Sequence, residues 1–214
     1  LRAIELDPES AEAHASRGVA LALKGAYREA EAALETSLRL NPRLFEGYFF
    51  YARIAFVQGK LEKAIEMYEK AEAVYPQDYQ SPLLVAQIYA DMGRPEEAQK
   101  SRRRGVQLVE ARLKLNPDDA RALYMGANGL VALGECKQGL EWAQQALELD
   151  PGDPMLLYNV ACIQALAGRV EDALDCLERS IANGLTEKRW LERDSNLDPV
   201  RSHPRYATLL KTLA

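Results

Sequence analysis

The chain has 214 residues, of which 48% are hydrophobic and 28% charged, with 27 basic and 32 acidic residues and a net charge of −5. These proportions are those of an ordinary globular chain, and the negative charge argues against a nucleic-acid binder that works by general attraction to phosphate. No apolar run approaches the roughly 18 residues of a membrane-spanning helix. The sequence opens at Leu1, without methionine and in a stretch typical of a helix end, so we expect a fragment whose other domains lie upstream.

Three classes of residue recur along the chain at one set of intervals. Intervals of 34, 34, 41 and 34 residues separate five glycines: Gly25, Gly59, Gly93, Gly134 and Gly168. The same intervals separate the prolines Pro8, Pro42, Pro76, Pro117 and Pro151, and the small residues Ala30, Ala64, Ala98, Gly139 and Ala173. A period near 34 residues is typical of stacked helix pairs. The spacing therefore predicts an all-α repeat protein.

Each repeat is expected to contain two helices joined by a glycine turn. In the first repeat, apolar and small residues fall at helical spacing over residues 11–24 and again as far as Leu40. Gly25 separates the two patterns, because glycine adopts backbone angles that other residues avoid. Asn41 and Pro42 end the second helix, since proline disfavours helical geometry in the residue before it.

The chain divides accordingly into a series of segments. Residues 1–8 are expected to be the end of a truncated repeat, and residues 188–214 a C-terminal cap. Between them we expect five repeats, over residues 11–44, 45–78, 79–119, 120–153 and 154–187. Each helix pair leaves an apolar face that the next pair buries, and the end units need polar caps.

The third repeat is seven residues longer than the others, and the extra residues lie between Ala98 and Pro117. Seven residues add about two helical turns and rotate the helix face by only about 20°. We therefore expect its second helix to extend over roughly residues 95–115. Gly105 lies inside this stretch, and the alternative is a break there with a short loop.

These residues resemble the tetratricopeptide repeat over about residues 1–184. That family favours small residues at positions 8, 20 and 27 of its unit, a bulky residue at position 24 and proline at position 32. Here position 8 holds Gly18, Ala52, Ala86, Ala127 and Ala161, and position 20 holds the Ala30 series. Arg102 at position 24 departs from the pattern. The resemblance implies a right-handed superhelical solenoid of antiparallel helix pairs with a C-terminal capping helix.

The tail resembles a closing segment that follows bacterial repeats of this kind, on the residues Trp190 to Pro199, Arg201 and Pro204 to Tyr206. In the family, this segment often ends multidomain proteins whose front half is a nucleotide cyclase, a serine/threonine kinase or a DNA-binding regulator. We expect Trp190, Leu197 and Leu209 or Leu210 to cover the last apolar face. Ser202 or His203, followed by Pro204, then begins a final helix that reaches about Leu213.

The resemblance also indicates where a ligand would bind, because first helices of the family line a concave groove. Carried over residue by residue, the groove positions predict a peptide-binding surface made of Phe49, Arg53, Phe56, Gln87, Arg121, Tyr124, Asn128 and Tyr158. Aromatic and arginine side chains dominate interface energies, and amides both donate and accept hydrogen bonds, which suits the main chain of an extended peptide. The alternative is that some of these aromatics pack between repeats.

One known groove chemistry is absent from these positions. Family members that hold the acidic C-terminal tails of heat-shock chaperones use lysine, asparagine and arginine at fixed groove positions. The corresponding residues here are Ala15, Val19, Phe50, Gln80 and Leu84. That clamp is therefore not expected in this chain.

No catalytic or metal-binding motif is recognisable. There is no glycine-rich phosphate loop, and no serine or cysteine has a base in a known motif. Cys136, Cys162 and Cys176 lack CxxC spacing and are expected to be buried reduced thiols. His14 and His203 are far apart in sequence and give little support to a zinc site. We expect no enzyme activity, catalytic residue, metal or cofactor.

The sequence thus favours a protein–protein interaction scaffold that binds a peptide or partner segment in the groove, as the non-catalytic part of a larger bacterial signalling protein. The alternative is a structural domain that self-assembles into oligomers through aromatic and end surfaces. The partner is expected to be a protein or peptide, with the upstream domain of the same chain as one candidate. No nucleic acid or membrane is expected as a partner, and the expected location is the cytoplasm.

Overall fold

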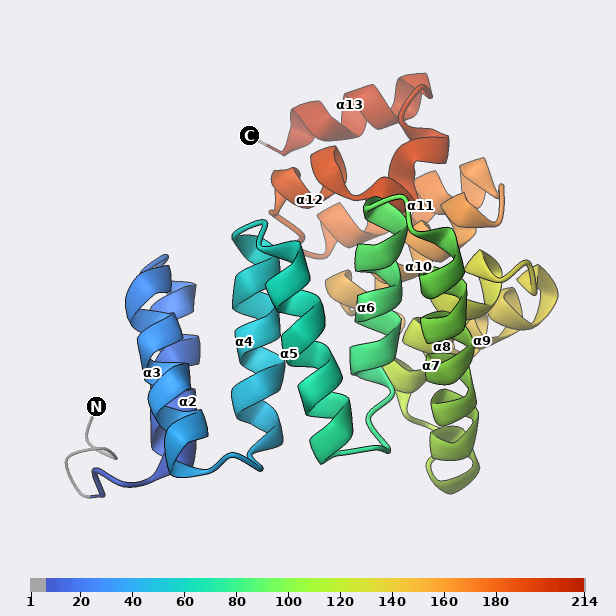
Figure 1. Ribbon diagram of the computed structural model, residues 1–214. Coiled ribbons are helices and arrows are strands. Elements are labelled where there is room, and N and C mark those ends of the chain that lie inside the picture. Colours follow the sequence, from blue (N-terminus) through green and yellow to red (C-terminus); the bar gives the residue numbers. More distant parts are fainter. Residues whose placement is uncertain (1–6, 214) are drawn as a thin grey trace. The chain divides into compact units, whose positions relative to one another are not determined.

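A computed structural model describes residues 7–213, and all regular structure in this range is helical. The all-α prediction is therefore confirmed. The described residues fall into two compact units, divided between Ser101 and Arg102 (Figure 1). The expected truncated repeat at residues 1–8 lies almost entirely outside the described residues.

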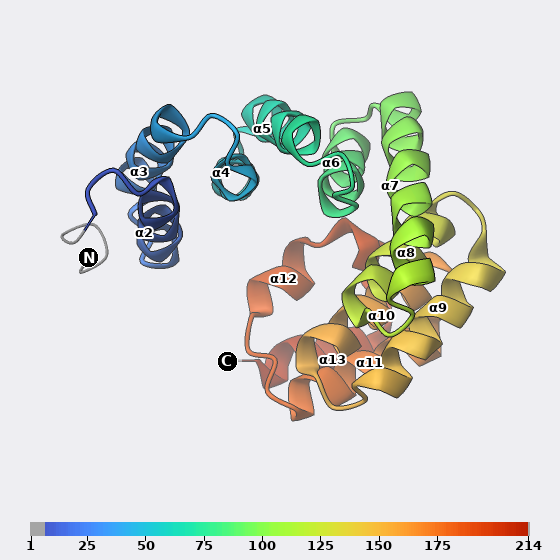
Figure 2. The same ribbon diagram turned by 90° about the horizontal axis from the view of Figure 1, so that it is seen from below.

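The first unit is a row of helices in chain order. Within it, α2 packs against α3 and α4 against α5, while α4 also packs on α2 and α3, and α5 on α6. Figure 2 shows the first two pairs nearly end-on, side by side. The helices are α2 (Ala11–Leu23), α3 (Tyr27–Leu40), α4 (Phe45–Val57), α5 (Leu61–Val74), α6 (Gln80–Asp91) and the start of α7 (Pro95–Leu115).

The second unit contains the rest of α7, two helix pairs and the cap. Here α8 packs against α9 and α10 against α11, and α10 also packs on α8 and α9. The paired helices are α8 (Ala120–Ala132), α9 (Cys136–Leu149), α10 (Pro154–Leu166) and α11 (Val170–Ala182). The cap consists of α12 (Lys188–Arg193), a 3-10 helix η1 (Ser195–Val200) and α13 (Pro204–Thr212).

Turns and caps set where the helices begin and end. The five repeat glycines all lie between paired helices with positive φ, for example 75° at Gly25 and 90° at Gly134, a conformation that glycine adopts without steric cost. The expected role of these glycines is confirmed. Asp119 and Asp153 cap the next helices, because their carboxylates accept from the N–H groups of Ala122 (3.0 Å) and Leu156 (2.5 Å).

Small residues allow the paired helices to approach closely, as the repeat pattern predicted. Ala30, Ala64, Ala98 and Ala173 are fully buried. At Gly139, an added Cβ would lie 2.6 Å from Val131 Cγ2 and 2.9 Å from the carbonyl oxygen of Ala127 on the facing helix α8. The extended helix is also confirmed, because α7 runs unbroken from Pro95 to Leu115 through Gly105.

Replacing Gly139 by alanine is expected to lower the free energy of unfolding by about 1–3 kcal/mol, because backbone atoms of α8 cannot move aside as a flexible side chain does. Gly152→Ala is the matched control, since a Cβ there meets no atom within 4 Å. Urea unfolding followed by circular dichroism measures both. Equal stability of the two variants would contradict the close approach of α8 and α9.

Candidate functional site

Phe49, one of the predicted groove residues, lies in an aromatic cluster. Its ring centroid is 5.4 Å from that of Phe45, 5.7 Å from Phe50 and 5.6 Å from Tyr68, and its side chain is only 7% exposed. The last two contacts are edge-on, the geometry that aromatic pairs favour. Phe49 therefore contributes to the packing of α4 on α5 and offers little surface to a ligand.

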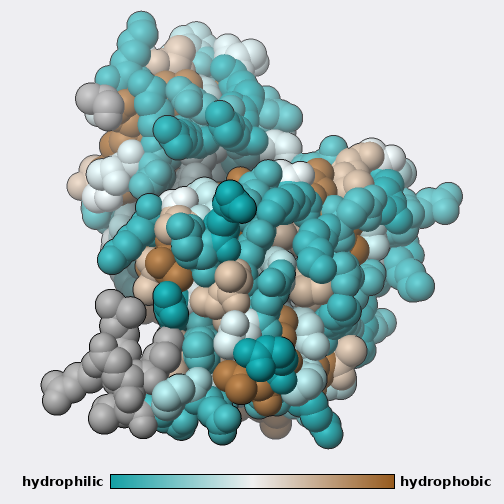
Figure 3. Space-filling model, turned by 60° about the vertical axis from the view of Figure 1, so that its left-hand side comes forward, coloured by the Kyte–Doolittle hydropathy of each residue, from teal (hydrophilic) through white to brown (hydrophobic). Residues whose placement is uncertain are grey.

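Exposed apolar residues of the first unit lie at the C-terminal ends of α2 and α4, among them the predicted groove residue Phe56. Phe56 is 42% exposed, Val57 64% and Leu23 84%, and α2 packs against α4. Leu23 and Val57 are equivalent residues of consecutive repeats, 34 positions apart. On the side of the molecule that Figure 3 shows, hydrophobic surface occurs as small patches among hydrophilic side chains.

Arg53 lies one turn before Phe56 and Val57 on α4 and is exposed. Among the described residues it forms no ion pair. Burial raises the pKa of the Tyr68 phenol well above its ordinary value, and the positive charge of Arg53 opposes this rise, so Arg53 lies close enough to Tyr68 to act on it. The guanidinium thus stands beside the aromatic cluster and faces solvent.

Gln87 is the remaining predicted groove residue of the first unit. It is half-buried on α6, and its Nε2 donates to Asp91 Oδ1 at 2.9 Å. One of its donors is therefore already used within the helix.

In the second unit, the predicted residues on α8 share one face. Arg121, Tyr124 and Asn128 follow each other at spacings of three and four residues, which places them on one side of a helix. Arg121 is exposed, and Tyr124 and Asn128 are half-buried. The structure therefore places these three side chains along one face of α8. That this face binds a peptide stays a prediction.

Tyr158 on α10 is covered by the cap. Its hydroxyl donates to Asp194 Oδ2 at 2.7 Å, and the Cys162 thiol, one turn further on, lies 3.6 Å from the same oxygen. The ring of Trp190 lies 5.9 Å from that of Tyr158, and η1 packs on α10. The sequence predicted that Tyr158 contacts a ligand. Because the cap covers Tyr158, a ligand that binds at this end of the chain would contact Trp190 instead.

Asp194 uses one carboxylate oxygen within the cap and the other to join the cap to α10. Oδ1 accepts from the N–H of Asn196 at 2.9 Å and so caps η1, while Oδ2 accepts from Tyr158 and Cys162. Burial raises the pKa of the Tyr158 phenol, and the neighbouring Cys162 and Asp194 raise it further. Burial likewise raises the pKa of the Cys162 thiol, with Asp194 adding to the effect. Both groups are held in their neutral, donating forms.

Two arginines hold the remaining parts of the cap in place. Arg201 donates to the carbonyl oxygens of Leu191 (3.0 Å), Glu192 (2.7 Å) and Asp194 (2.8 Å), which lie at or just beyond the C-terminal end of α12. Arg205 on α13 contacts three carboxylates along one face of α11: Glu171 at 2.6 Å, Asp175 at 2.7 Å and Glu178 at 2.8 Å.

The predicted capping role is confirmed for Leu197 and Leu209, which are buried, and the final helix begins after His203 as expected. Trp190 differs from the prediction, because it is 41% exposed while its neighbour Leu191 is fully buried. Consecutive residues of a helix point about 100° apart, so only one of the two faces the core. The exposed tryptophan is the functional candidate that the sequence did not single out.

Comparison with known proteins agrees with this architecture. The family model for the tetratricopeptide repeat (TPR) matches residues 1–43, 24–79, 51–103 and 124–184. The chain belongs to the tetratricopeptide repeat family. A TPR fold implies a scaffold for protein–protein interaction.

Relatives of known sequence or structure cover this TPR chain to different extents. The mouse protein O-mannosyl-transferase TMTC1 is 27% identical over 170 residues, which is 79% of this chain but only 18% of that relative. TTC0263, a thermophilic TPR protein of Thermus thermophilus, has a TM-score of 0.66 at 21% identity and covers 94% of this chain and 100% of its own. YrrB, described as a TPR protein with an unusual peptide-binding site, has a TM-score of 0.51 at 21% identity over 86% of this chain and 91% of its own.

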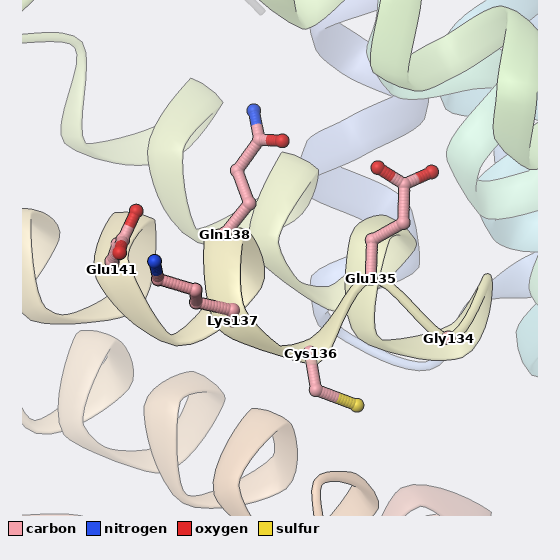
Figure 4. Close-up of a pocket in the computed structure, with 6 residues that line it drawn as sticks. All are labelled: Gly134, Glu135, Cys136, Lys137, Gln138 and Glu141. Carbon is pink, nitrogen blue, oxygen red and sulfur yellow. The ribbon is translucent and has the colours of Figure 1, made fainter.

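A surface pocket of about 390 Å³ lies at the start of α9, lined by Gly134, Glu135, Cys136, Lys137, Gln138 and Glu141. Figure 4 shows that Glu135 and Gln138 point to one side of the helix and Cys136 to the other. Because these side chains diverge, they do not form a ligand site. Within residues 7–213, no cluster of His, Cys, Asp and Glu could hold a metal ion. In the same range, no helix combines the length and apolar character needed to cross a bilayer.

Removing the shared carboxylate is expected to destabilise the TPR chain. Asp194→Ala leaves the buried Tyr158 hydroxyl without an acceptor and should lower the free energy of unfolding by about 1–3 kcal/mol. In the Tyr158→Phe background the loss should be smaller, because that hydroxyl is already gone. Urea unfolding of the four proteins of this double-mutant cycle measures the difference. An equal loss in both backgrounds would mean that the two side chains are not coupled.

The cysteines should differ in reactivity. All three are free thiols; Cys162 and Cys176 are buried as predicted, whereas Cys136 is only half-buried. Burial raises the pKa of Cys162 and Cys176, and the thiolate is the reactive form. At pH 8, Ellman's reagent is expected to label Cys136 rapidly and the other two only in denaturant. Rapid labelling of Cys136→Ser in the native state would contradict the packing of α10 and α11.

Proposed function

We propose that the chain is a scaffold whose first-helix surfaces bind an extended segment of a partner protein. In the first unit, the segment places an apolar side chain against Leu23, Phe56 and Val57 and an acidic group beside Arg53. The observation that carries the proposal is the exposure of these apolar side chains next to an arginine that forms no ion pair within the described part of the chain. An exposed apolar patch of this kind is a common mark of an interaction site.

The chemistry of this surface favours a peptide over a small molecule. Arginine and aromatic residues supply most of the energy of protein interfaces, and Arg53 and Phe56 lie one helical turn apart. In the second unit, Asn128 is half-buried on the same face of α8 as Arg121 and Tyr124. Its amide both donates and accepts, as peptide groups require.

For the context of this scaffold, we propose the non-catalytic part of a larger bacterial signalling protein in the cytoplasm. The support is the tail from Trp190 to Tyr206, whose hydrogen bonds to α10 and ion pairs to α11 fit the resemblance to closing segments of such proteins. The partner is then a segment of another protein or of a further domain of the same chain. The partial coverage of the mouse relative is consistent with a repeat module that occurs within longer proteins.

A peptide display library tests the proposal directly. Peptides selected on the parent chain are expected to lose at least about tenfold in affinity for an Arg53→Glu/Phe56→Ala variant, because both the charge and the anchor surface are removed. Fluorescence polarisation of labelled peptides measures the affinities. Arg39→Glu/Leu149→Ala is the matched control, since it changes an exposed arginine and an exposed apolar residue outside the groove positions.

The alternative function, self-assembly, gives a different result in the same experiment. If no selected peptide depends on Arg53 and Phe56, and light scattering shows an oligomer that the groove variant leaves intact, assembly through other surfaces replaces peptide binding. Peptides that fail to bind the groove variant but still bind the control variant exclude this outcome.

A further inference from the structure

The cap helix α12 carries a basic and aromatic stripe on its outer side. Successive helical residues turn by about 100°, so Arg189, Arg193 and Trp190 fall within one sector of about 100°, with Arg193 between the other two. Leu191 points away from this sector and is fully buried. All three residues of the stripe are exposed, and α12 lies at the margin of the second unit (Figure 2).

The indole of Trp190 is held on a fixed support. Its ring packs at 5.9 Å on Tyr158, and the Tyr158 hydroxyl is tied to Asp194 at 2.7 Å. Asp194 in turn caps η1, the element that follows α12. A large aromatic surface, 41% exposed and already positioned, loses little conformational freedom on binding.

The arginines of the cap fall into two groups. Arg201 and Arg205 are used in building the cap, through the carbonyls of α12 and the carboxylates of α11. The side chains of Arg189 and Arg193, by contrast, make no hydrogen bond or ion pair within residues 7–213. The structure of the cap therefore does not account for the two positive charges beside Trp190.

We propose that Arg189, Trp190 and Arg193 form a docking surface for an acidic segment of a partner protein, with an apolar side chain placed on the indole and carboxylates beside the arginines. This inference rests on the proposed function in taking the partner to be a protein segment, and it names the chemistry of that segment. It also replaces the buried Tyr158 by the exposed Trp190 as the aromatic residue that contacts the partner near the last repeat.

Charge complementarity selects a short acidic peptide over a polyanion. The whole chain carries a net charge of −5, and Glu187 and Glu192 are exposed on either side of the stripe. An anionic membrane or a nucleic acid presents negative charge over a wide area and would meet these carboxylates too. A peptide of a few residues aligns its carboxylates with the arginines alone.

Synthetic ten-residue peptides with a central leucine or phenylalanine flanked by glutamates provide the probe, and glutamine versions provide the neutral comparison. The parent chain is expected to bind the glutamate peptides at least about tenfold more tightly than an Arg189→Glu/Arg193→Glu variant does. Lys137→Glu/Lys211→Glu is the matched control, because both lysines are exposed and lie outside α12. It makes the same change in net charge and should bind like the parent.

Tryptophan emission gives a second readout, with Trp190→Phe to assign the signal to that indole. Circular dichroism melting confirms that each variant is folded. Equal binding by the α12 and control variants, or binding of the parent only to anionic vesicles or single-stranded DNA, would overturn the inference. The Arg53→Glu/Phe56→Ala variant separates the two proposals. If this variant still binds the glutamate peptides, the α12 proposal is supported, whatever the result for the groove. If the library peptides bind the Arg189→Glu/Arg193→Glu variant as well as the parent, the groove proposal is unaffected.

Discussion

Each helix pair of this chain leaves one apolar face that only a neighbouring element buries, and the structure follows from that constraint. Between repeats, the next pair supplies the cover, as where α10 packs on α8 and α9. After α11 there is no further pair among the described residues, and the cap supplies the cover with Leu191, Leu197 and Val200, all fully buried. A six-residue helix and a 3-10 helix have little stability of their own, so their form depends on the surface they cover.

The way in which the cap meets α10 also decides which surface remains for binding. Tyr158, a predicted groove residue, and Cys162, one turn further along α10, have buried polar atoms that need an acceptor. Asp194 provides it for both. These contacts enclose the Tyr158 and Cys162 side chains and leave the Trp190 indole 41% exposed beside Tyr158. The cap thus meets two requirements at once: it provides the acceptor for the buried polar groups of α10, and it covers the apolar face of the last helix pair.

The sequence was sufficient for the features that depend on local rules. Positive φ at Gly25 and the close approach at Gly139 follow from backbone sterics, and the unbroken α7 follows from a seven-residue insertion that keeps helical register. The roles of Tyr158 and Trp190 were not accessible in this way. Tyr158 is covered by a residue 36 positions later, which no local period reveals, and α12 is too short for its apolar pattern to define a buried face.

Phe49 shows the same limit within a repeat. The repeat pattern predicts that Phe49 lies on the groove side of α4, but position fixes only the direction of the Cα–Cβ bond, and the size of the neighbours decides burial. The rings of Phe45, Phe50 and Tyr68 surround that of Phe49 and therefore shield it from solvent. Arg53, one turn further along the same helix, has a longer and charged side chain whose end stays in water. Two residues one turn apart on α4 therefore differ, because the Phe49 ring is enclosed by the aromatic cluster while the end of the Arg53 side chain remains exposed.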